Sequence, residues 1–244
     1  MTGPLNSLWE PPFPFPKGAE NLPSHGILVS TPALLASVKE SAPEPLDHKV
    51  SVFMLGGTTI SLGPNFFVAG PILGAPMAVM ALEILIGGGA KEIVYAGFGG
   101  ALGLDLNCGD YLFPHLAFSA EGTSTHYGGG GTFKPDSKLY SKLQKAADAN
   151  FHSGAIFSTD GPFRETQTIR RDYENLGALA VDMEVSAVMA AATFREIALA
   201  AVVLITDSFA RGTWEEGLNT PKFKTALTEL GPILWKALGA PKIF

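Results

Sequence analysis

The sequence lacks the features that several large classes of protein need. It has one cysteine, Cys108, among 244 residues, which excludes a disulfide framework and fits a reducing compartment. Its net charge is −6 and no lysine or arginine cluster is present, which argues against a nucleic-acid surface. The most apolar segment, IALAAVVLIT (197–206), is too short to span a bilayer, and the N-terminus has no signal-peptide pattern. We therefore expect a cytoplasmic protein that binds neither membrane nor nucleic acid.

Metal and cofactor signals are also missing. No histidine and carboxylate cluster has the spacing of metal ligands, so no metal is expected. GFGGALG (97–103) follows an apolar run, but a dinucleotide fingerprint would need a third glycine where Leu102 stands, and no P-loop lysine is present. Gly97, Gly99 and Gly100 instead predict a tight turn from strand to loop that lets the backbone approach a small ligand.

Short apolar runs alternate with helical patterns along the chain. Buried strands are predicted at 26–30, 50–55, 65–70, 92–97, 110–118, 177–181 and 201–206. Helices are predicted at 75–86, 183–196 and 225–238, the first ended by Gly87, Gly88 and Gly89. This alternation predicts one α/β domain over residues 25–244, a three-layer sandwich with helices on both faces of a sheet. Residues 1–24, rich in proline and aromatics, predict an arm on a neighbouring surface.

Five segments occur in the order found in one family. They are GAPMAVMALEILIGGGAKEIVYAGFGGAL (74–102), GDYLF (109–113), EGTSTHY (121–127), VDMEVSAVMAAA (181–192) and VVLITDSF (202–209). The ordered set resembles the nucleoside phosphorylase family, which includes uridine phosphorylases, purine nucleoside phosphorylases and methylthioadenosine nucleosidases. The resemblance covers roughly residues 25–210. It implies a mixed, partly closed central sheet, a homo-oligomer built from dimers, and cleavage of the N-glycosidic bond of a nucleoside.

The segment VDMEVSA resembles the family's ribose-binding motif. The resemblance gives Glu184 the 2′- and 3′-hydroxyls of the ribose, and Met183 the underside of the sugar. A carboxylate can accept two charge-assisted hydrogen bonds from a vicinal diol. Asp182 stands where the family usually has glutamate. The alternative interpretation is a helix start decorated with acidic residues, which the helix dipole favours.

The remaining base-site residues also come from the resemblance. Asp207 matches the aspartate that protonates a departing purine; the alternative is a helix N-cap after the strand. Phe163 resembles the aromatic that stacks on the base, and Gln167 the glutamine that reads uracil. The arginine that accompanies this glutamine is replaced by Ile169, so the base stays open between purine and pyrimidine. His126 would border the pocket.

The arginines of the family's phosphate site are absent, since no arginine precedes Arg164. Leu34 stands where the N-terminal turn should carry one, and Tyr95 replaces another in the strand. Phe98 replaces the hydroxyl residue of the glycine segment. Binding phosphate in a desolvated pocket without cationic donors costs several kcal/mol. The glycine segment at 97–103 therefore resembles the family's phosphate-site segment in a chain whose phosphate-binding residues have been replaced.

Three interpretations follow. The protein hydrolyses its nucleoside with water; or it remains a phosphorylase, with phosphate as co-substrate held by Ser30, Thr31 or lysines; or it binds a nucleoside without turning it over. The family's nucleosidases position water with a glutamate near the N-terminal turn, where this chain offers only hydroxyls. Glu184 and Asp207 favour an enzyme, and water and phosphate stay equally open.

Overall fold

The fold is described by a computed structural model of the chain. The structure describes residues 16–52, 56–148, 151–210 and 212–241. Most of the predicted N-terminal arm, residues 1–15, lies outside this range, as do residues 53–55 of one predicted strand. No helix in these described ranges is long and apolar enough to cross a membrane.

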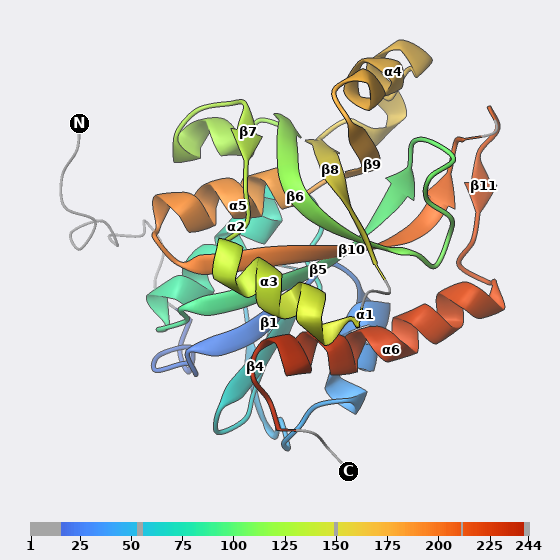
Figure 1. Cartoon of the computed structure of the whole chain (residues 1–244). Helices are drawn as coiled ribbons and strands as arrows, with labels where there is room; N and C mark the ends of the chain where they lie inside the picture. Colours follow the sequence, from blue (N-terminus) through green and yellow to red (C-terminus); the bar gives the residue numbers. More distant parts are fainter. Residues whose placement is uncertain (1–15, 53–55, 149–150, 211, 242–244) are drawn as a thin grey trace.

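The centre of the molecule is one mixed sheet of eleven strands in the described part of the chain (Figure 1). The strands are β1 (His25–Val29), β2 (His48–Ser51), β3 (Thr59–Leu62), β4 (Phe66–Gly70), β5 (Glu92–Ala101), β6 (Tyr111–Ala120), β7 (Thr132–Phe133), β8 (His152–Thr159), β9 (Ala178–Asp182), β10 (Ala198–Ser208) and β11 (Glu215–Glu216). Strands β1, β4, β5 and β10 are almost continuous apolar runs, as expected of strands covered on both faces.

Part of this sheet closes on itself. Strand β5 pairs in parallel with β10 and antiparallel with β9. Strand β10 continues through β6 and β8 to β9, so that five strands form a ring. Strands β1, β4, β3 and β2 extend the sheet beyond β5 as an open wing. The mixed, partly closed sheet predicted from the family resemblance is therefore confirmed.

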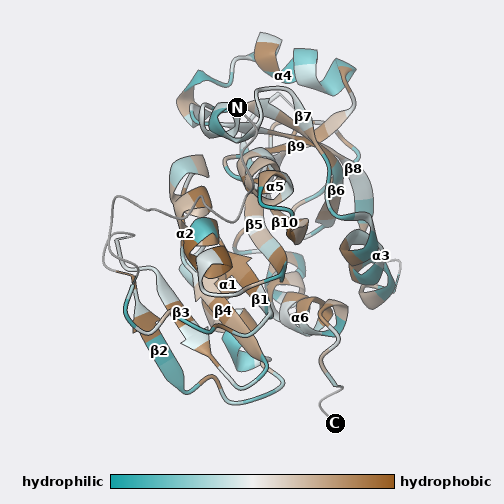
Figure 2. Cartoon of the chain, turned by 90° about the vertical axis from the view of Figure 1, so that its left-hand side faces the viewer, coloured by the Kyte–Doolittle hydropathy of each residue, from teal (hydrophilic) through white to brown (hydrophobic). Residues whose placement is uncertain are grey.

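Helices cover both faces of the sheet, which confirms the predicted three layers. The helices are α1 (Pro32–Glu40), α2 (Ala75–Gly87), α3 (Ser137–Ala146), α4 (Gln167–Asn175), α5 (Val185–Phe194) and α6 (Pro221–Ala237), with 3₁₀ helices η3 (Thr123–Tyr127) and η4 (Pro162–Arg164). Helices α2 and α5 pack in one core, whereas α1, α3 and α6 pack in a second core on the other face. In Figure 2 hydrophobic residues concentrate on α2 and on β1, β4 and β5.

Most elements predicted from periodicity are present, and several others were missed. The predicted helices correspond to α2, α5 and α6, and the strands at 26–30, 65–70, 110–118, 177–181 and 201–206 to β1, β4, β6, β9 and β10. Only the start of the run at 50–55 falls in β2. Helices α1, α3 and α4 have polar or short apolar patterns and begin at Thr31, Asp136 and Thr166, whose side chains each accept a hydrogen bond from the first turn.

The glycine-rich segment does not form the predicted turn. Strand β5 continues through Gly97 and Gly99 to Ala101. A Cβ at Gly97 would lie 2.5 Å from the Tyr95 hydroxyl, and one at Gly99 would lie 2.8 Å from the Val181 carbonyl oxygen. These glycines therefore let a tyrosine and the crossing strand β9 approach the strand, rather than reversing the direction of the chain.

Candidate active site

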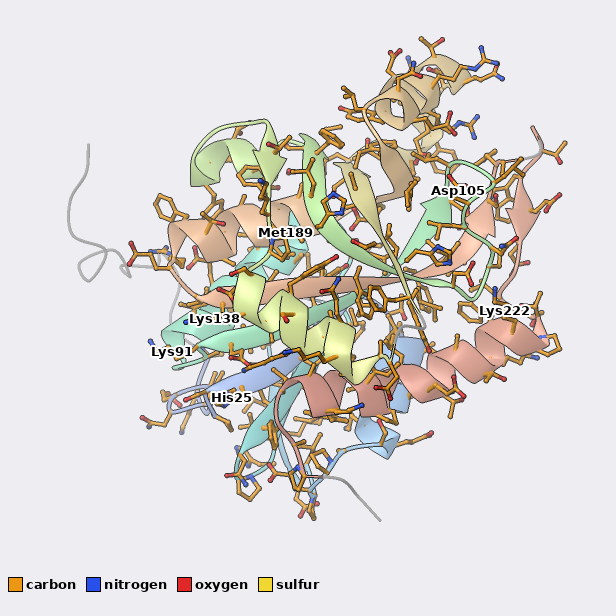
Figure 3. The ribbon with its side chains drawn as sticks, in the orientation of Figure 1. His25, Lys91, Asp105, Lys138, Met189 and Lys222 are labelled. Atoms are coloured by element: carbon orange, nitrogen blue, oxygen red, sulfur yellow. The ribbon has the colours of Figure 1, made fainter. Side chains whose placement is uncertain are left out.

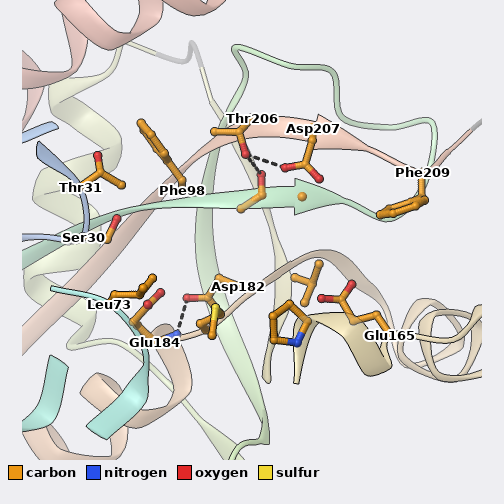
Figure 4. A pocket seen from close by; sticks show the side chains of 15 residues that line it. Ser30, Thr31, Leu73, Phe98, Glu165, Asp182, Glu184, Thr206, Asp207 and Phe209 are labelled. Atoms are coloured by element: carbon orange, nitrogen blue, oxygen red, sulfur yellow. Dashed lines mark hydrogen bonds between the residues drawn. The ribbon is translucent and has the colours of Figure 1, made fainter. Parts of the chain in front are cut away.

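A cavity of about 350 Å³ opens where β1, β5, β9 and β10 end (Figure 4). Its size lies in the range of small-molecule sites, and ligands of open α/β sheets commonly bind at the carboxyl ends of strands. The lining residues are Ser30, Thr31, Leu73, Phe98, Gly99, Gly100, Pro162, Glu165, Val181, Asp182, Met183, Glu184, Thr206, Asp207 and Phe209. Strand ends thus bring together most of the residues that the family resemblance selected.

Asp182 and Glu184 lie at one end of this cavity, and their carboxylates bind different parts of the chain. The Asp182 carboxylate accepts the backbone N–H groups of Glu184 and Val185, at 3.0 and 2.7 Å, and thereby caps α5. It also accepts the Ser158 hydroxyl at 2.5 Å. Glu184 is the N-cap residue of α5, but its side chain makes no capping hydrogen bond. Its carboxylate instead accepts the Gly74 N–H at 2.6 Å and the Tyr95 O–H at 3.1 Å.

The two carboxyl groups are both buried, at 5% and 4% exposure for Asp182 and Glu184. Burial and the neighbouring Glu184 charge raise the pKa of Asp182 from its ordinary value of 3.8 to about 7. Burial also raises the pKa of Glu184, against the lowering effect of its Gly74 and Tyr95 hydrogen bonds. Two adjacent buried acids do not ionise independently, so Asp182 holds its proton to a higher pH than an ordinary aspartate does.

Tyr95 supports Glu184 from beneath the cavity. Its side chain is fully buried, and its ring lies over Gly97, where no side chain competes for the space. Burial and the Glu184 and Asp182 charges hold the pKa of Tyr95 well above its ordinary value, so the phenol remains a hydrogen-bond donor. Neither Tyr95 nor Gly97 lines the cavity, in contrast to the predicted direct contact with a ligand. Ser30 lines it, and its hydroxyl is buried beside the Tyr95 phenol.

Asp207 stands at the opposite end of the cavity, inside β10. No helix starts there, so the alternative interpretation as a helix N-cap is wrong. One carboxylate oxygen accepts the Thr206 hydroxyl at 2.7 Å and the other accepts the Trp214 indole N–H at 3.0 Å. A Cβ at Gly100 would lie 3.0 Å from this carboxylate, which explains why a glycine faces it.

Three residues predicted for the base site do not line the cavity. Phe163 lies in η4 with a fully exposed side chain, because the turn presents the preceding Pro162 to the cavity instead. Gln167 is exposed at the first position of α4. His126 is exposed in η3, which packs against α5 and α2 rather than beside the cavity. The structure of the chain thus provides no contact of these three side chains with the cavity.

Two residues that sequence reasoning missed, Phe209 and Glu165, line the cavity near Asp207. Phe209 lines the cavity, and the Arg170 guanidinium carbon lies 3.9 Å from the centroid of its ring. Glu165 lines the same end, and burial raises the pKa of its carboxyl group. Phe209 belongs to the segment VVLITDSF, two positions after Asp207, but nothing in the sequence pattern shows that the residue directly after β10 reaches the cavity wall.

Comparison with known proteins decides the family. The model of the phosphorylase superfamily matches residues 24–237. The chain belongs to this superfamily. A guanosine phosphorylase of Halorubrum lacusprofundi is 28% identical over 154 residues, which are 62% of this chain and 64% of that protein. The matched part therefore spans a little under two thirds of that relative's length.

Solved structures of this superfamily share the fold. A uridine phosphorylase of Vibrio fischeri superposes with a TM-score of 0.76, at 16% identity, over 90% of this chain and 93% of the other. A 5′-methylthioadenosine/S-adenosyl homocysteine nucleosidase of Campylobacter jejuni gives a TM-score of 0.71, at 16% identity, over 88% and 99%. The fold class and the family resemblance found in the sequence are both confirmed.

In this superfamily member the cavity is lined by four carboxylates, those of Glu165, Asp182, Glu184 and Asp207. No lysine or arginine is among its described lining residues. Lys91 and Lys138 lie on the side where β5 begins, away from the cavity (Figure 3), and Lys222 pairs with Asp110. The described ranges contain no group of three or more His, Cys, Asp or Glu residues that could hold a metal. The cavity therefore suits a neutral ligand rich in hydrogen-bond donors.

Proposed function

We propose that this protein hydrolyses the N-glycosidic bond of a nucleoside, with water rather than phosphate as the acceptor. One observation carries the choice of water: four carboxylates and no basic side chain line the described cavity. A phosphate there would be desolvated against like charges without a cationic donor, whereas water carries no charge. Tyr95 adds to this argument, because it fills the strand position of the family's arginine and donates its hydrogen to Glu184.

Glu184 is proposed to hold the ribose. Each of its carboxylate oxygens accepts one hydrogen bond from the protein, from Gly74 or Tyr95, which leaves acceptor capacity for the 2′- and 3′-hydroxyls. Both protein donors also fix the orientation of the carboxylate before the sugar arrives. Met183 lines the cavity beside it and supplies apolar contact to the sugar.

The reaction needs one proton at the base and removes one from water. As the bond between the anomeric carbon and the base nitrogen breaks, its electron pair leaves with the base, which takes a proton from the protonated form of Asp207. The water oxygen then bonds to the anomeric carbon, and the proton that it loses goes to the Asp182–Glu184 pair. Exchange with solvent then removes this proton from the pair and returns one to Asp207, which restores the starting state. Ser30, whose hydroxyl is buried, lines the same end and can orient that water.

A phosphate acceptor remains the second candidate because α1 begins at the cavity, and helix N-termini bind anions. The Thr31 side chain, however, already accepts the Leu34 N–H at 3.2 Å, and Leu34 itself is fully buried. The similar proteins include both reaction types by name, a guanosine phosphorylase and a nucleosidase. None of these observations favours binding without turnover.

The deciding experiment measures release of free base from purine and pyrimidine nucleosides, with and without inorganic phosphate, and identifies the sugar product. We expect release without phosphate and free ribose as the product. In ¹⁸O-labelled water the label should appear on the anomeric oxygen. Release that needs phosphate and yields ribose 1-phosphate would overturn the choice of water. Tight nucleoside binding with no release under either condition would support the non-catalytic alternative.

We also propose that the protein is a cytoplasmic homo-oligomer, a dimer or a trimer of dimers. Leu73 lines the cavity yet is 71% exposed in the single chain, which is unusual for a leucine at a binding site and is consistent with cover from a second copy. Sedimentation equilibrium would test the assembly, and a monomer at all concentrations would contradict it.

A further inference from the structure

We propose that Phe209, backed by Arg170, is the stacking platform for the base, and that Glu165 reads adjacent N–H donors on the base edge. This arrangement selects a 2-amino-6-oxopurine, the guanine class, over uracil. The inference rests on the proposed function, since it names the base of the nucleoside that the same cavity would take. Its carriers are residues that the family motifs did not point to.

Phe209 is the aromatic residue placed to stack on a base at the Asp207 end. It lines the cavity there, whereas the other aromatic lining residue, Phe98, lies at the Ser30 and Thr31 end (Figure 4). The Phe98 ring packs edge-on against Phe223, at a centroid distance of 5.6 Å. A flat ring beside the proton donor is what a departing base requires, because bases stack on aromatic side chains.

Arg170 holds this platform in place. Its guanidinium lies over the Phe209 ring at 3.9 Å, so one face of the ring is covered. Its Nη1 atom is buried and has no hydrogen-bond partner among the described residues. A stacked cation restricts the ring and places positive charge near Glu165 without entering the cavity. The part of the Phe209 ring that lines the cavity is then left for the base to stack on.

Glu165 supplies the reading group. It lies between η4 and α4, lines the cavity at the same end as Asp207, and is half-buried. Burial raises the pKa of Glu165, the Arg170 charge opposes that rise, and the Asp207 charge adds to it. These influences indicate that Arg170 and Asp207 are the charged groups near Glu165. In Figure 4 the Glu165 and Asp207 side chains lie on either side of the space beside Phe209.

The hydrogen-bonding capacity of this end determines which base it accepts. A carboxylate offers two acceptor oxygens, and a 2-amino-6-oxopurine presents two adjacent donors, the N1–H and the 2-amino group. Uracil presents a single N–H between two carbonyl oxygens, which would face the carboxylates unfavourably. A hypoxanthine base keeps the N1–H but lacks the amino group. Guanosine should therefore bind best, inosine next and uridine least.

The test measures binding by isothermal titration calorimetry and base release by chromatography, with guanosine, inosine and uridine. The variants are Glu165→Gln and Phe209→Leu. Glu174→Gln, on α4 but outside the cavity, controls for the loss of a glutamate. Phe194→Leu controls for the loss of an Arg–Phe contact, because the Arg195 guanidinium carbon lies 5.4 Å from the centroid of its ring.

We expect Glu165→Gln to weaken guanosine binding at least about tenfold, since a hydrogen bond to a charged group is lost. It should also bring the guanosine-to-inosine ratio close to one, an effect that general destabilisation would not produce. Phe209→Leu should weaken all three nucleosides together, and both control variants should bind like the wild type. Preference of the wild type for uridine, or an unchanged guanosine-to-inosine ratio in Glu165→Gln, would overturn the inference.

The two proposals fail in different ways. If the wild type binds guanosine selectively through Glu165 but releases no base, the proposed hydrolysis is wrong and the base assignment stands. If it releases base from nucleosides without preferring guanosine in binding or turnover, the hydrolysis stands and the base assignment is wrong.

Discussion

The two ends of the cavity are built in different ways. At the end proposed to bind the sugar, Asp182 and Glu184 lie at the junction of β9 and α5, are almost fully buried, and have protein donors on every carboxylate oxygen. At the end proposed to bind the base, Glu165 and Phe209 lie on segments beyond the central strands and remain partly exposed. A site rooted in paired strands is rigid and recognisable from a motif, whereas one on connecting segments is set by how those segments fold back.

The largest expected effect breaks the sugar end. Glu184→Gln keeps the volume but replaces the carboxylate that we propose binds the ribose diol, and kcat/KM should fall at least about a hundredfold. Steady-state base release checks this. Glu121→Gln is the matched control, because Glu121 is also buried but is held by Ser124 and Ser186 outside the cavity. Equal losses in both variants, or retained activity in Glu184→Gln, would contradict the ribose assignment.

A smaller effect is expected at Tyr95, and it tests whether the hydrogen bond from Tyr95 to Glu184 contributes to turnover. Tyr95→Phe removes the hydroxyl that donates to Glu184 at 3.1 Å and leaves the ring in place, so kcat/KM should fall about five- to tenfold. Tyr111→Phe is the control, since its buried hydroxyl donates to the Ala226 carbonyl oxygen away from the cavity. That variant should lose thermal stability and keep kcat/KM. Unchanged kcat/KM in Tyr95→Phe would reduce Tyr95 to a packing residue.

The raised pKa of Asp182 predicts that the stability of the folded chain depends on pH. Between the ordinary value of 3.8 and about 7, the folded state holds a proton that the unfolded state has released. Rising pH through this window therefore lowers the free energy of unfolding, and the raised pKa of Glu184 acts in the same direction. Urea denaturation of wild type and Asp182→Asn across this window should show a steeper decline for the wild type. Parallel declines would contradict the raised pKa.

The smallest expected effect tests whether Phe163 or Phe209 is the residue that stacks on the base. Phe163→Ala should change kcat/KM by less than about twofold, because the side chain is fully exposed and lies outside the cavity. The family motif, taken alone, predicts a large loss on the same change. Base-release kinetics with the preferred nucleoside distinguishes them, and a loss comparable with that of Phe209→Leu would restore Phe163 as the stacking residue.

Most of the fold could be predicted from the sequence. The apolar runs of β1, β4, β5 and β10 and the hydrophobic α2 and α5 are long and periodic, so local pattern identifies them. The order of the motifs gave the family and, with it, the closed sheet. Helices α1, α3 and α4 were not predicted, because their N-cap residues were the main signal and their apolar faces are narrow. The turn predicted at Gly97–Gly100 was wrong because those glycines serve close approach within a strand.

By itself, the sequence determined that the chain is an α/β member of a nucleoside-cleaving family and that no arginine precedes Arg164. Residue identity and motif order suffice for these properties. Only the tertiary structure decided that Tyr95 turns beneath Glu184, that Pro162 rather than Phe163 faces the cavity, and that Arg170, Phe209 and Glu165 meet there. These contacts depend on how strands and turns from distant parts of the chain are arranged in space. The local order of residues does not determine that arrangement.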